Sequence, residues 1–228
     1  MNLSNFYDLS YSDLSDFISS NFSLEKKKTS MRTNQIWKFV YKKGLRETSK
    51  FSNISSELKD NMEKSFNFNR TNIAEKKISK DGTIKWLLKL SDNNLVETVF
   101  IPSGKRGTLC VSSQVGCTLN CKFCHTGTQL MVKNLTTHEI INQILVAKDE
   151  LNDWGSQKKI TNIVYMGMGE PFYNYDNVKK SISILRERNG LDYSSKKITV
   201  STAGISNEIM KAADEIGTYL ALSLHAPT

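Results

Sequence analysis

The sequence has no long apolar run. Its 228 residues are 39% hydrophobic, but no stretch approaches the roughly 18 uninterrupted apolar residues that a membrane span needs. Residues 1–22 also lack an export leader, because Asp8, Asp13 and Asp16 interrupt them and no basic segment precedes an apolar core. We therefore expect a globular protein of one or two domains in the cytoplasm, with no membrane segment.

Cysteine is scarce as well, with only four in the chain. In the reducing cytoplasm, such cysteines are more often ligands or reactive thiols than disulfide partners. Three of them lie within eight residues, Cys117, Cys121 and Cys124, and Cys110 stands apart. A second cysteine pair, which a structural zinc site usually needs, is missing.

Positive charge is concentrated in the N-terminal half. Residues 1–106 carry 19 Lys and Arg against 12 Asp and Glu, whereas residues 107–228 carry 12 against 11. Aromatic residues lie among these basic ones, namely Trp37, Phe39, Tyr41 and Phe51. Such a mixture suits an RNA backbone with bases stacked on the rings. A solvated helix face with Trp37 and Phe39 in the core explains the pattern equally well.

The first part of the chain reads as helices followed by a hairpin. Apolar spacing predicts helices at 12–21, 33–43 and 55–66, the second stopping near Gly44. Period-two segments at 73–79 and 83–90 flank Lys80-Asp81-Gly82, which predicts a hairpin with a type I′ turn. A further strand is expected at 95–101, closed by Pro102.

From residue 108 strands and helices alternate. Strands are expected at 108–115, 160–166, 197–201 and 219–224. The intervening helices include one at 137–151, where Thr136 and Glu139 have capping-box spacing. This pattern predicts an α/β fold with a parallel sheet, a partial (β/α) barrel of about four βα units. We expect a helical domain at 1–70, a β-hairpin extension at 71–102, and an incomplete barrel at 103–228.

The cysteine loop carries the clearest chemistry. Three thiolates spaced as in Cys117-x₃-Cys121-x₂-Cys124 can hold three irons of a [4Fe-4S] cluster and leave the fourth open. That iron can chelate the amino and carboxylate groups of S-adenosylmethionine (SAM), and an electron from the cluster can then cleave the sulfonium. Zinc with His125 as fourth ligand is the alternative, and adjacent Cys124 and His125 are awkward partners for it. Buried, unreactive cysteines fit poorly because Asn120 and Lys122 interrupt any apolar run.

Five further motifs lie before and after the cysteine loop. In chain order they are Val96–Pro102, Thr108–Cys117, Met166–Pro171, Val200–Gly204 and Ser223–Ala226. Together they resemble the RlmN family of radical SAM enzymes, which methylate carbon 2 of adenine in 23S rRNA and in some tRNAs. The resemblance is strong from about residue 96 onward and looser before it.

The resemblance implies roles for individual residues. SAM would be held by Gly169, Glu170, Ser201, Ser223, Leu224 and His225. Glu170 can accept hydrogen bonds from the methionine ammonium, and Gly167 and Gly169 can let backbone approach the ligand. The family also implies that Glu97 is a general base, that Cys110 resolves a covalent RNA adduct, and that an electron donor such as a flavodoxin is needed. Without the family resemblance, Glu97 would be interpreted as an exposed charge and Cys110 as a small buried hydrophobic residue.

The chain also departs from the family. RlmN enzymes use a further cysteine near the C-terminus, and none follows Cys124 here. We therefore expect a C-terminally truncated chain that binds the cluster, and SAM weakly, but does not complete methyl transfer. We also expect poor solubility or dimerisation through the edge of the last strand. Two alternatives to an RlmN-type methyltransferase remain. One is an enzyme of another radical SAM reaction, and the other is a non-catalytic iron-sulfur or RNA-binding remnant.

Overall fold

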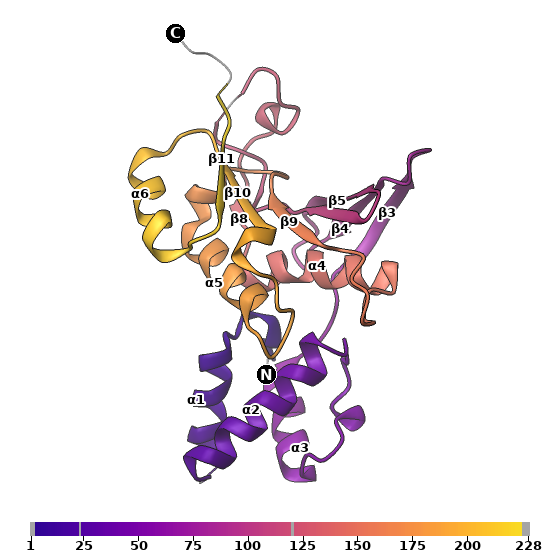
Figure 1. Ribbon diagram of the computed structural model, residues 1–228, viewed down its shortest axis with the longest axis vertical. Coiled ribbons are helices and arrows are strands. Elements are labelled where there is room, and N and C mark those ends of the chain that lie inside the picture. The colour runs from indigo at the N-terminus through magenta and orange to yellow at the C-terminus, as the bar shows by residue number, and fades with distance from the viewer. Residues whose placement is uncertain (1–2, 23, 120, 225–228) are drawn as a thin grey trace.

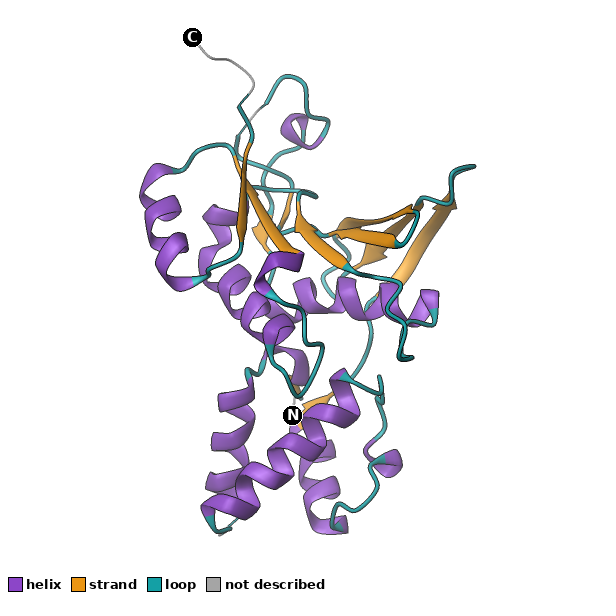
Figure 2. Ribbon diagram, viewed as in Figure 1, coloured by secondary structure: helices purple, strands orange, loops and turns teal. Residues whose placement is uncertain are grey.

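A computed structural model describes residues 3–22, 24–119 and 121–224. Helices α1 to α3 form an N-terminal unit at one end, helices α4 and α5 lie between this unit and a large sheet, and α6 lies at the side of that sheet (Figures 1 and 2). The helices are α1 (Tyr11–Asn21), α2 (Lys26–Tyr41), α3 (Ser56–Ser65), α4 (Thr137–Leu151), α5 (Tyr175–Arg186) and α6 (Ser206–Glu215). Short 3₁₀ turns are η1 (Phe6–Asp8), η2 (Thr48–Lys50), η3 (Thr126–Thr128), η4 (Pro171–Asn174) and η5 (Ser195–Lys197). No helix in the described ranges is both long and apolar enough to span a bilayer.

The N-terminal unit is closed by a short parallel pairing of β1 (Ser4–Asn5) with β2 (Phe66–Asn67). Its interior is aromatic, with rings in mutual contact that include Phe6, Tyr7, Trp37, Tyr41 and Phe68. Trp37, Phe39, Tyr41 and Phe51 are all buried. Of the two interpretations left open by the sequence, the burial of these rings favours the second, because the helices use them to build their own core.

The main sheet has seven strands in the order β11-β10-β9-β6-β5-β4-β3. They are β3 (Asn72–Ile78), β4 (Ile84–Lys89), β5 (Leu95–Ser103), β6 (Arg106–Cys110), β9 (Asn162–Tyr165), β10 (Ile198–Thr202) and β11 (Tyr219–Leu222). Strands β6, β9, β10 and β11 pair in parallel, and β3, β4 and β5 extend the sheet antiparallel. A two-stranded ladder of β7 (Gln114–Val115) and β8 (Lys133–Asn134) lies beside it. The expected α/β fold, a parallel four-stranded segment preceded by helices and a hairpin, is confirmed.

Three local expectations were wrong. In the hairpin only Gly82 has positive φ, at 84°, and its amide donates to Ser79 O, so the turn is not type I′, which needs two such residues. Pro102 does not close β5 but lies within it, paired with Gly107 of β6. The pairing of β5 with β4 ends at Phe100, so β4 does not need an N–H from residue 102. The strand expected at 108–115 breaks after Cys110, and residues 111–113 form no strand.

Helix α4 links the sheet to the N-terminal unit. Its capping box is present as expected, with Thr136 Oγ1 accepting from Glu139 N and the Glu139 carboxylate accepting from Thr136 N. Buried Gln143 fixes the helix to the sheet, because its Oε1 accepts from Thr98 Oγ1 at 2.9 Å and from Ser112 N at 2.8 Å. On its other side, Asp8 accepts from both the backbone N–H and the ring of His138.

Candidate active site

Eight of the residues singled out in the sequence line one cleft of about 270 Å³. They are Gly167 and Gly169, the three thiols of Cys117, Cys121 and Cys124, together with Glu170, Ser201 and Ser223. The last three follow or end parallel strands β9, β10 and β11, and the cysteine loop follows β6 and β7. Carboxyl ends of parallel strands meet at one edge of a sheet, which is where (β/α) barrels bind ligands. The strand order thus brings together residues that are up to 106 positions apart.

Tight turns shape the cysteine loop. Gly116 has φ of 76°, and a Cβ there would collide with the carbonyl of Leu130, so glycine is required before Cys117. Cys124 N donates to Cys121 O at 3.0 Å, which turns the chain so that both side chains reach the cleft. Phe123 is 65% exposed at the rim.

The donor set of this loop fits an iron-sulfur cluster. All four cysteines are free thiols and partly accessible. Burial raises the pKa of the Cys117 thiol, and the neighbouring Cys121, Cys124 and Glu170 raise it further, while a hydrogen bond from Leu119 N opposes them. No three His, Cys, Asp or Glu side chains of the described residues converge as a single metal ion would require. The thiols instead line a common space, as a cluster that takes one thiolate per iron requires.

Glu170 is held rigidly although it lines the cleft. It is 3% exposed, and its carboxylate accepts from Phe172 N at 3.1 Å and Ala203 N at 2.9 Å. These bonds tie the end of β9 to the end of β10. The same oxygens keep lone pairs for a further donor in the cleft, so the residue can orient a ligand ammonium as well as hold the loop.

The glycines of Gly167-Met168-Gly169 are required by close packing within the protein. A Cβ on Gly167 would lie 2.8 Å from Val111 O, and one on Gly169 would approach the Gln114 side chain. Gly169 also has φ of 96°. Both glycines line the cleft, but the close approach that requires them is to the Val111–Gln114 segment of the protein itself.

The serines at the ends of β10 and β11 are joined. Ser201 Oγ and Ser223 Oγ lie 3.1 Å apart in a hydrogen bond, and both face the cleft. Leu224, the next residue, is 69% exposed and is not among the cleft residues. His225 lies outside the described residues.

Glu97 and Cys110 are not in this cleft. Glu97 lines a second cavity of about 610 Å³, which shares Phe123, Cys124 and Thr126 with the first. Its carboxylate accepts from Lys85 Nζ at 2.8 Å. Cys110 ends β6, and burial raises the pKa of its thiol to about 11. The two residues therefore lie near the cysteine loop without sharing the cleft with its three thiols.

The Ser112–Gln114 segment, which sequence reasoning took as ordinary strand, organises both cavities. Ser112 Oγ donates to Glu97 O at 2.7 Å and accepts from Met168 N at 2.9 Å. Gln114 Oε1 accepts from Glu170 N at 2.8 Å, and its Nε2 donates to Asn134. The signal that could have revealed this segment is the run of three polar residues inside an otherwise apolar strand.

Comparison with known proteins gives a consistent pattern. A family model described as the Radical SAM superfamily matches residues 111–228. The dual-specificity RNA methyltransferase RlmN of Chelativorans sp. (strain BNC1) is 45% identical over 224 residues, which cover 91% of this chain and 55% of that protein. RlmN of Nitrobacter winogradskyi is 48% identical over 208 residues, covering 86% and 52% respectively. The chain thus spans about half the length of the curated relatives it matches.

A solved structure is also similar. The crystal structure of a radical SAM methyltransferase from Sphaerobacter thermophilus superimposes with a TM-score of 0.87 at 32% sequence identity. The match covers 99% of this chain and 64% of that one. The similarity therefore includes the N-terminal helices as well as the sheet.

Proposed function

The chain belongs to the radical SAM superfamily, and from that premise we propose that it contributes to an RNA methyltransferase of RlmN type. The proposed reaction is methylation of carbon 2 of adenine in 23S rRNA and tRNA. The observation that carries the proposal is the shared cleft of Cys117, Cys121, Cys124, Glu170, Ser201 and Ser223. Identities of 45% and 48% to RlmN proteins support the choice of reaction.

We assign the three thiols of the loop to a [4Fe-4S] cluster. When bound, such a cluster supplies one electron to cleave the sulfonium of SAM. Glu170 is proposed to accept hydrogen bonds from the SAM ammonium, and Ser201, Ser223 and Gly169 to line the rest of the SAM site. Leu224 and His225 complete the set that the family pattern assigns to SAM.

The second cavity is the proposed site of the adenine. Glu97 is assigned as general base there, with Lys85 holding its carboxylate. Cys110 is assigned to resolve a covalent adduct with the RNA. The cavity shares Phe123, Cys124 and Thr126 with the cleft, which supports a base and SAM bound on either side of one loop.

The N-terminal helices, residues 1–70, are proposed as an RNA-binding accessory domain, followed by the extension at 71–102 and the radical SAM core at 103–228. The exposed positive charge of Lys26, Lys27 and Lys28 supports this assignment. Substrates of this kind and a cluster of reduced thiols suit a cytoplasmic reaction with a flavodoxin-like electron donor.

The test is anaerobic reconstitution of the chain with iron and sulfide, followed by reduction and addition of SAM. We expect an iron-sulfur absorption and EPR signal that is lost when Cys117, Cys121 and Cys124 are replaced by alanine but kept in Cys110→Ala. We also expect 5′-deoxyadenosine in the product mixture. A cluster that forms equally well in the triple variant would overturn the proposal.

Methyl transfer is tested separately. RNA is incubated with the reduced protein and its nucleosides are analysed by mass spectrometry. These 228 residues contain no cysteine after Cys124, so we expect SAM cleavage without 2-methyladenosine from them alone. Methylated RNA from these residues alone would show that the route through a C-terminal cysteine is wrong for this chain.

A further inference from the structure

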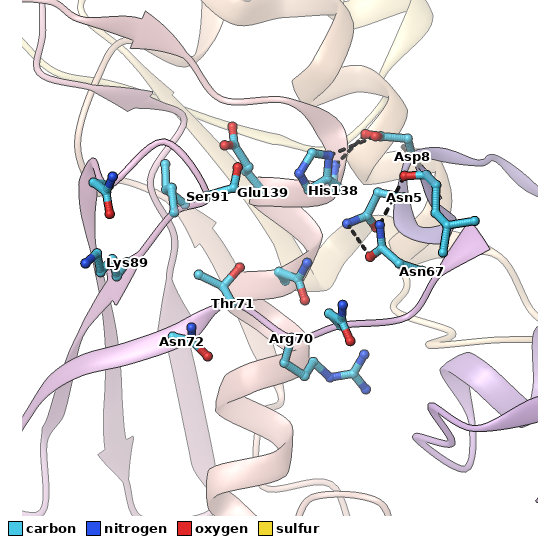
Figure 3. Close-up of a pocket in the computed structure, with 15 residues that line it drawn as sticks. Asn5, Asp8, Asn67, Arg70, Thr71, Asn72, Lys89, Ser91, His138 and Glu139 are labelled. Carbon is cyan, nitrogen blue, oxygen red and sulfur yellow. Dashed lines mark hydrogen bonds and ion pairs between the residues drawn. The ribbon is translucent and has the colours of Figure 1, made fainter. Parts of the chain in front are cut away.

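A third cavity, polar and also of about 610 Å³, lies away from the candidate active site and from the cavity of Glu97. It is bounded by the first turn of α4, the turn between β4 and β5, and the segment that leads from the N-terminal unit into β3 (Figure 3). No residue lines both this cavity and either of the two near the cysteine loop. Its volume is in the range of pockets that hold a small ligand or part of a larger one.

The walls of this cavity are made of amides and hydroxyls. Six asparagines line it, namely Asn5, Asn67, Asn69, Asn72, Asn93 and Asn142. Thr71 and Ser91 add hydroxyls, Leu3 and Leu90 are the apolar lining residues, and the imidazole of His138, which is bonded to Asp8, is the one ring among the described lining residues. The lining thus suits a strongly hydrogen-bonding ligand more than a set of stacked bases.

Much of this hydrogen-bonding capacity is unused within the described chain. The side chains of Asn69, Asn72, Thr71 and Ser91 have no partner there. Asn142 is 2% exposed, and its Oδ1 also lacks a partner. A buried amide without a partner is costly unless a ligand or water satisfies it.

Among the described residues, the charges around the cavity leave one cation without a partner. Asp8 is bonded to His138, Glu139 to Lys133, and Arg70 to Asp149. Lys89 is exposed and has no ion-pair or hydrogen-bond partner among the described residues. It lies directly across the hairpin from Asn72, with which it is paired in register. The cavity therefore presents an unpaired ammonium beside an unpaired amide.

We propose that this cavity binds the ribose-phosphate backbone of the RNA substrate. Lys89 and Ser91 contact phosphate oxygens, and Asn72 contacts the ribose 2′-hydroxyl. Arg, Lys, Asn, Ser and Thr are the side chains that make such backbone contacts, and the 2′-hydroxyl distinguishes RNA from DNA. The inference rests on the proposed function, since it supplies that reaction with a docking site for its substrate outside the active site.

The first experiment measures fluorescence anisotropy of a short RNA hairpin with an adenine in its loop, titrated with the 228-residue chain. The variant is Lys89→Gln, and the matched control is Lys80→Gln, which removes the same charge from the far turn of the same hairpin. Raising salt about fourfold should weaken binding of the unmodified chain and of Lys80→Gln about threefold more than binding of Lys89→Gln, as expected for one lost phosphate contact.

The second experiment compares RNA with DNA of the same sequence. Asn72→Ala should weaken RNA binding about fivefold and leave DNA binding nearly unchanged, because the lost contact is to the 2′-hydroxyl. Asn72 and Lys89 are both exposed, so neither variant should alter the circular dichroism spectrum or the thermal midpoint, and these are measured as the folding control.

The outcomes separate this inference from the proposed function. If the unmodified chain binds RNA and both cavity variants behave like Lys80→Gln, the cavity is a solvent-filled crevice and the inference is wrong. If the unmodified chain binds no RNA, the inference also fails. Cluster formation and SAM cleavage are measured without RNA, and they test the proposed chemistry independently of either result.

Discussion

At the scale of single residues, the four cysteines lie in different electrostatic surroundings. Burial raises the pKa of Cys110 to about 11, so at neutral pH this thiol keeps its proton and is a weak nucleophile. Any role in attacking a bound RNA adduct therefore needs a partner that removes the proton. The structure supplies none next to Cys110 within the described residues, since the hydrogen bond affecting its pKa comes from the backbone of Met166.

This raised pKa predicts how Cys110 reacts. In the iron-free chain, alkylation of Cys110 by iodoacetamide should rise about tenfold for each pH unit up to roughly pH 10, because the thiolate fraction rises in that proportion below the pKa. Mass spectrometry of the alkylated peptides measures the rate, with a short unfolded Cys peptide as reference. A rate that levels off below pH 9 would contradict the raised pKa.

The hydrogen bonds of Glu170 predict how much stability is lost when this residue is replaced. Glu170→Ala removes the acceptor for Phe172 N and Ala203 N, leaving the amide of buried Phe172 unpaired and releasing that of Ala203, an exposed residue. We expect the free energy of unfolding to fall by about 1–3 kcal/mol. Glu170→Gln keeps one acceptor oxygen and should lose less than half as much. Urea denaturation followed by circular dichroism compares the two, and equal losses would mean that the amides are not held as described.

At the scale of elements, the N-terminal cap of α4 allows the contribution of one local contact to stability to be measured. Thr136→Ala removes the side chain that caps Glu139 N, so the chain should lose about 1 kcal/mol of unfolding free energy. Thr136→Ser keeps the hydroxyl and should unfold like the unmodified chain. The same denaturation experiment measures both, and a Ser variant as unstable as the Ala variant would assign the loss to the methyl group instead.

The elements also show what local sequence can predict. The start of α4 is found from the spacing of Thr136 and Glu139, because a capping box is a contact between near neighbours. The convergence of Glu170, Ser201 and Ser223 is predictable because parallel strands place their ends together. The bond between Asp8 and His138 joins residues 130 positions apart, and nothing in the neighbourhood of either residue indicates it.

The burial of the N-terminal aromatics was unpredictable for a related reason. Trp37 and Tyr41 lie one helical turn apart among basic residues, a pattern equally typical of an RNA-binding face and of a core face. Only the packing of Phe6, which is itself stacked on Phe68, against them decides between the two. The polar cavity could not be predicted because its six asparagines come from four separate segments of the chain.

At the scale of the whole molecule, the exposed edge of strand β11 favours association with another chain. Tyr219, Leu220 and Leu222 are 55%, 45% and 56% exposed on the strand that forms one edge of the sheet. An apolar edge with free backbone groups pairs readily with another chain. We therefore expect these 228 residues alone to self-associate.

Leu222→Lys tests this expectation. A charge on the edge disfavours pairing, so sedimentation velocity should show a larger monomer fraction than for the unmodified chain at the same concentration. Leu130→Lys is the matched control, because it adds the same charge to a leucine that is 89% exposed in the cysteine loop. Equal monomer fractions for the two variants would rule out the β11 edge as the contact.

The closure of the N-terminal unit by β1 and β2 has a consequence for how the chain is made. Its ladder and the aromatic contacts among Phe6, Tyr7, Trp37, Tyr41 and Phe68 all fall within residues 4–68. On a ribosome this unit can complete its own interior before most of the large sheet has emerged. The unit then stands ready as a folded platform when α4 emerges and docks His138 against Asp8.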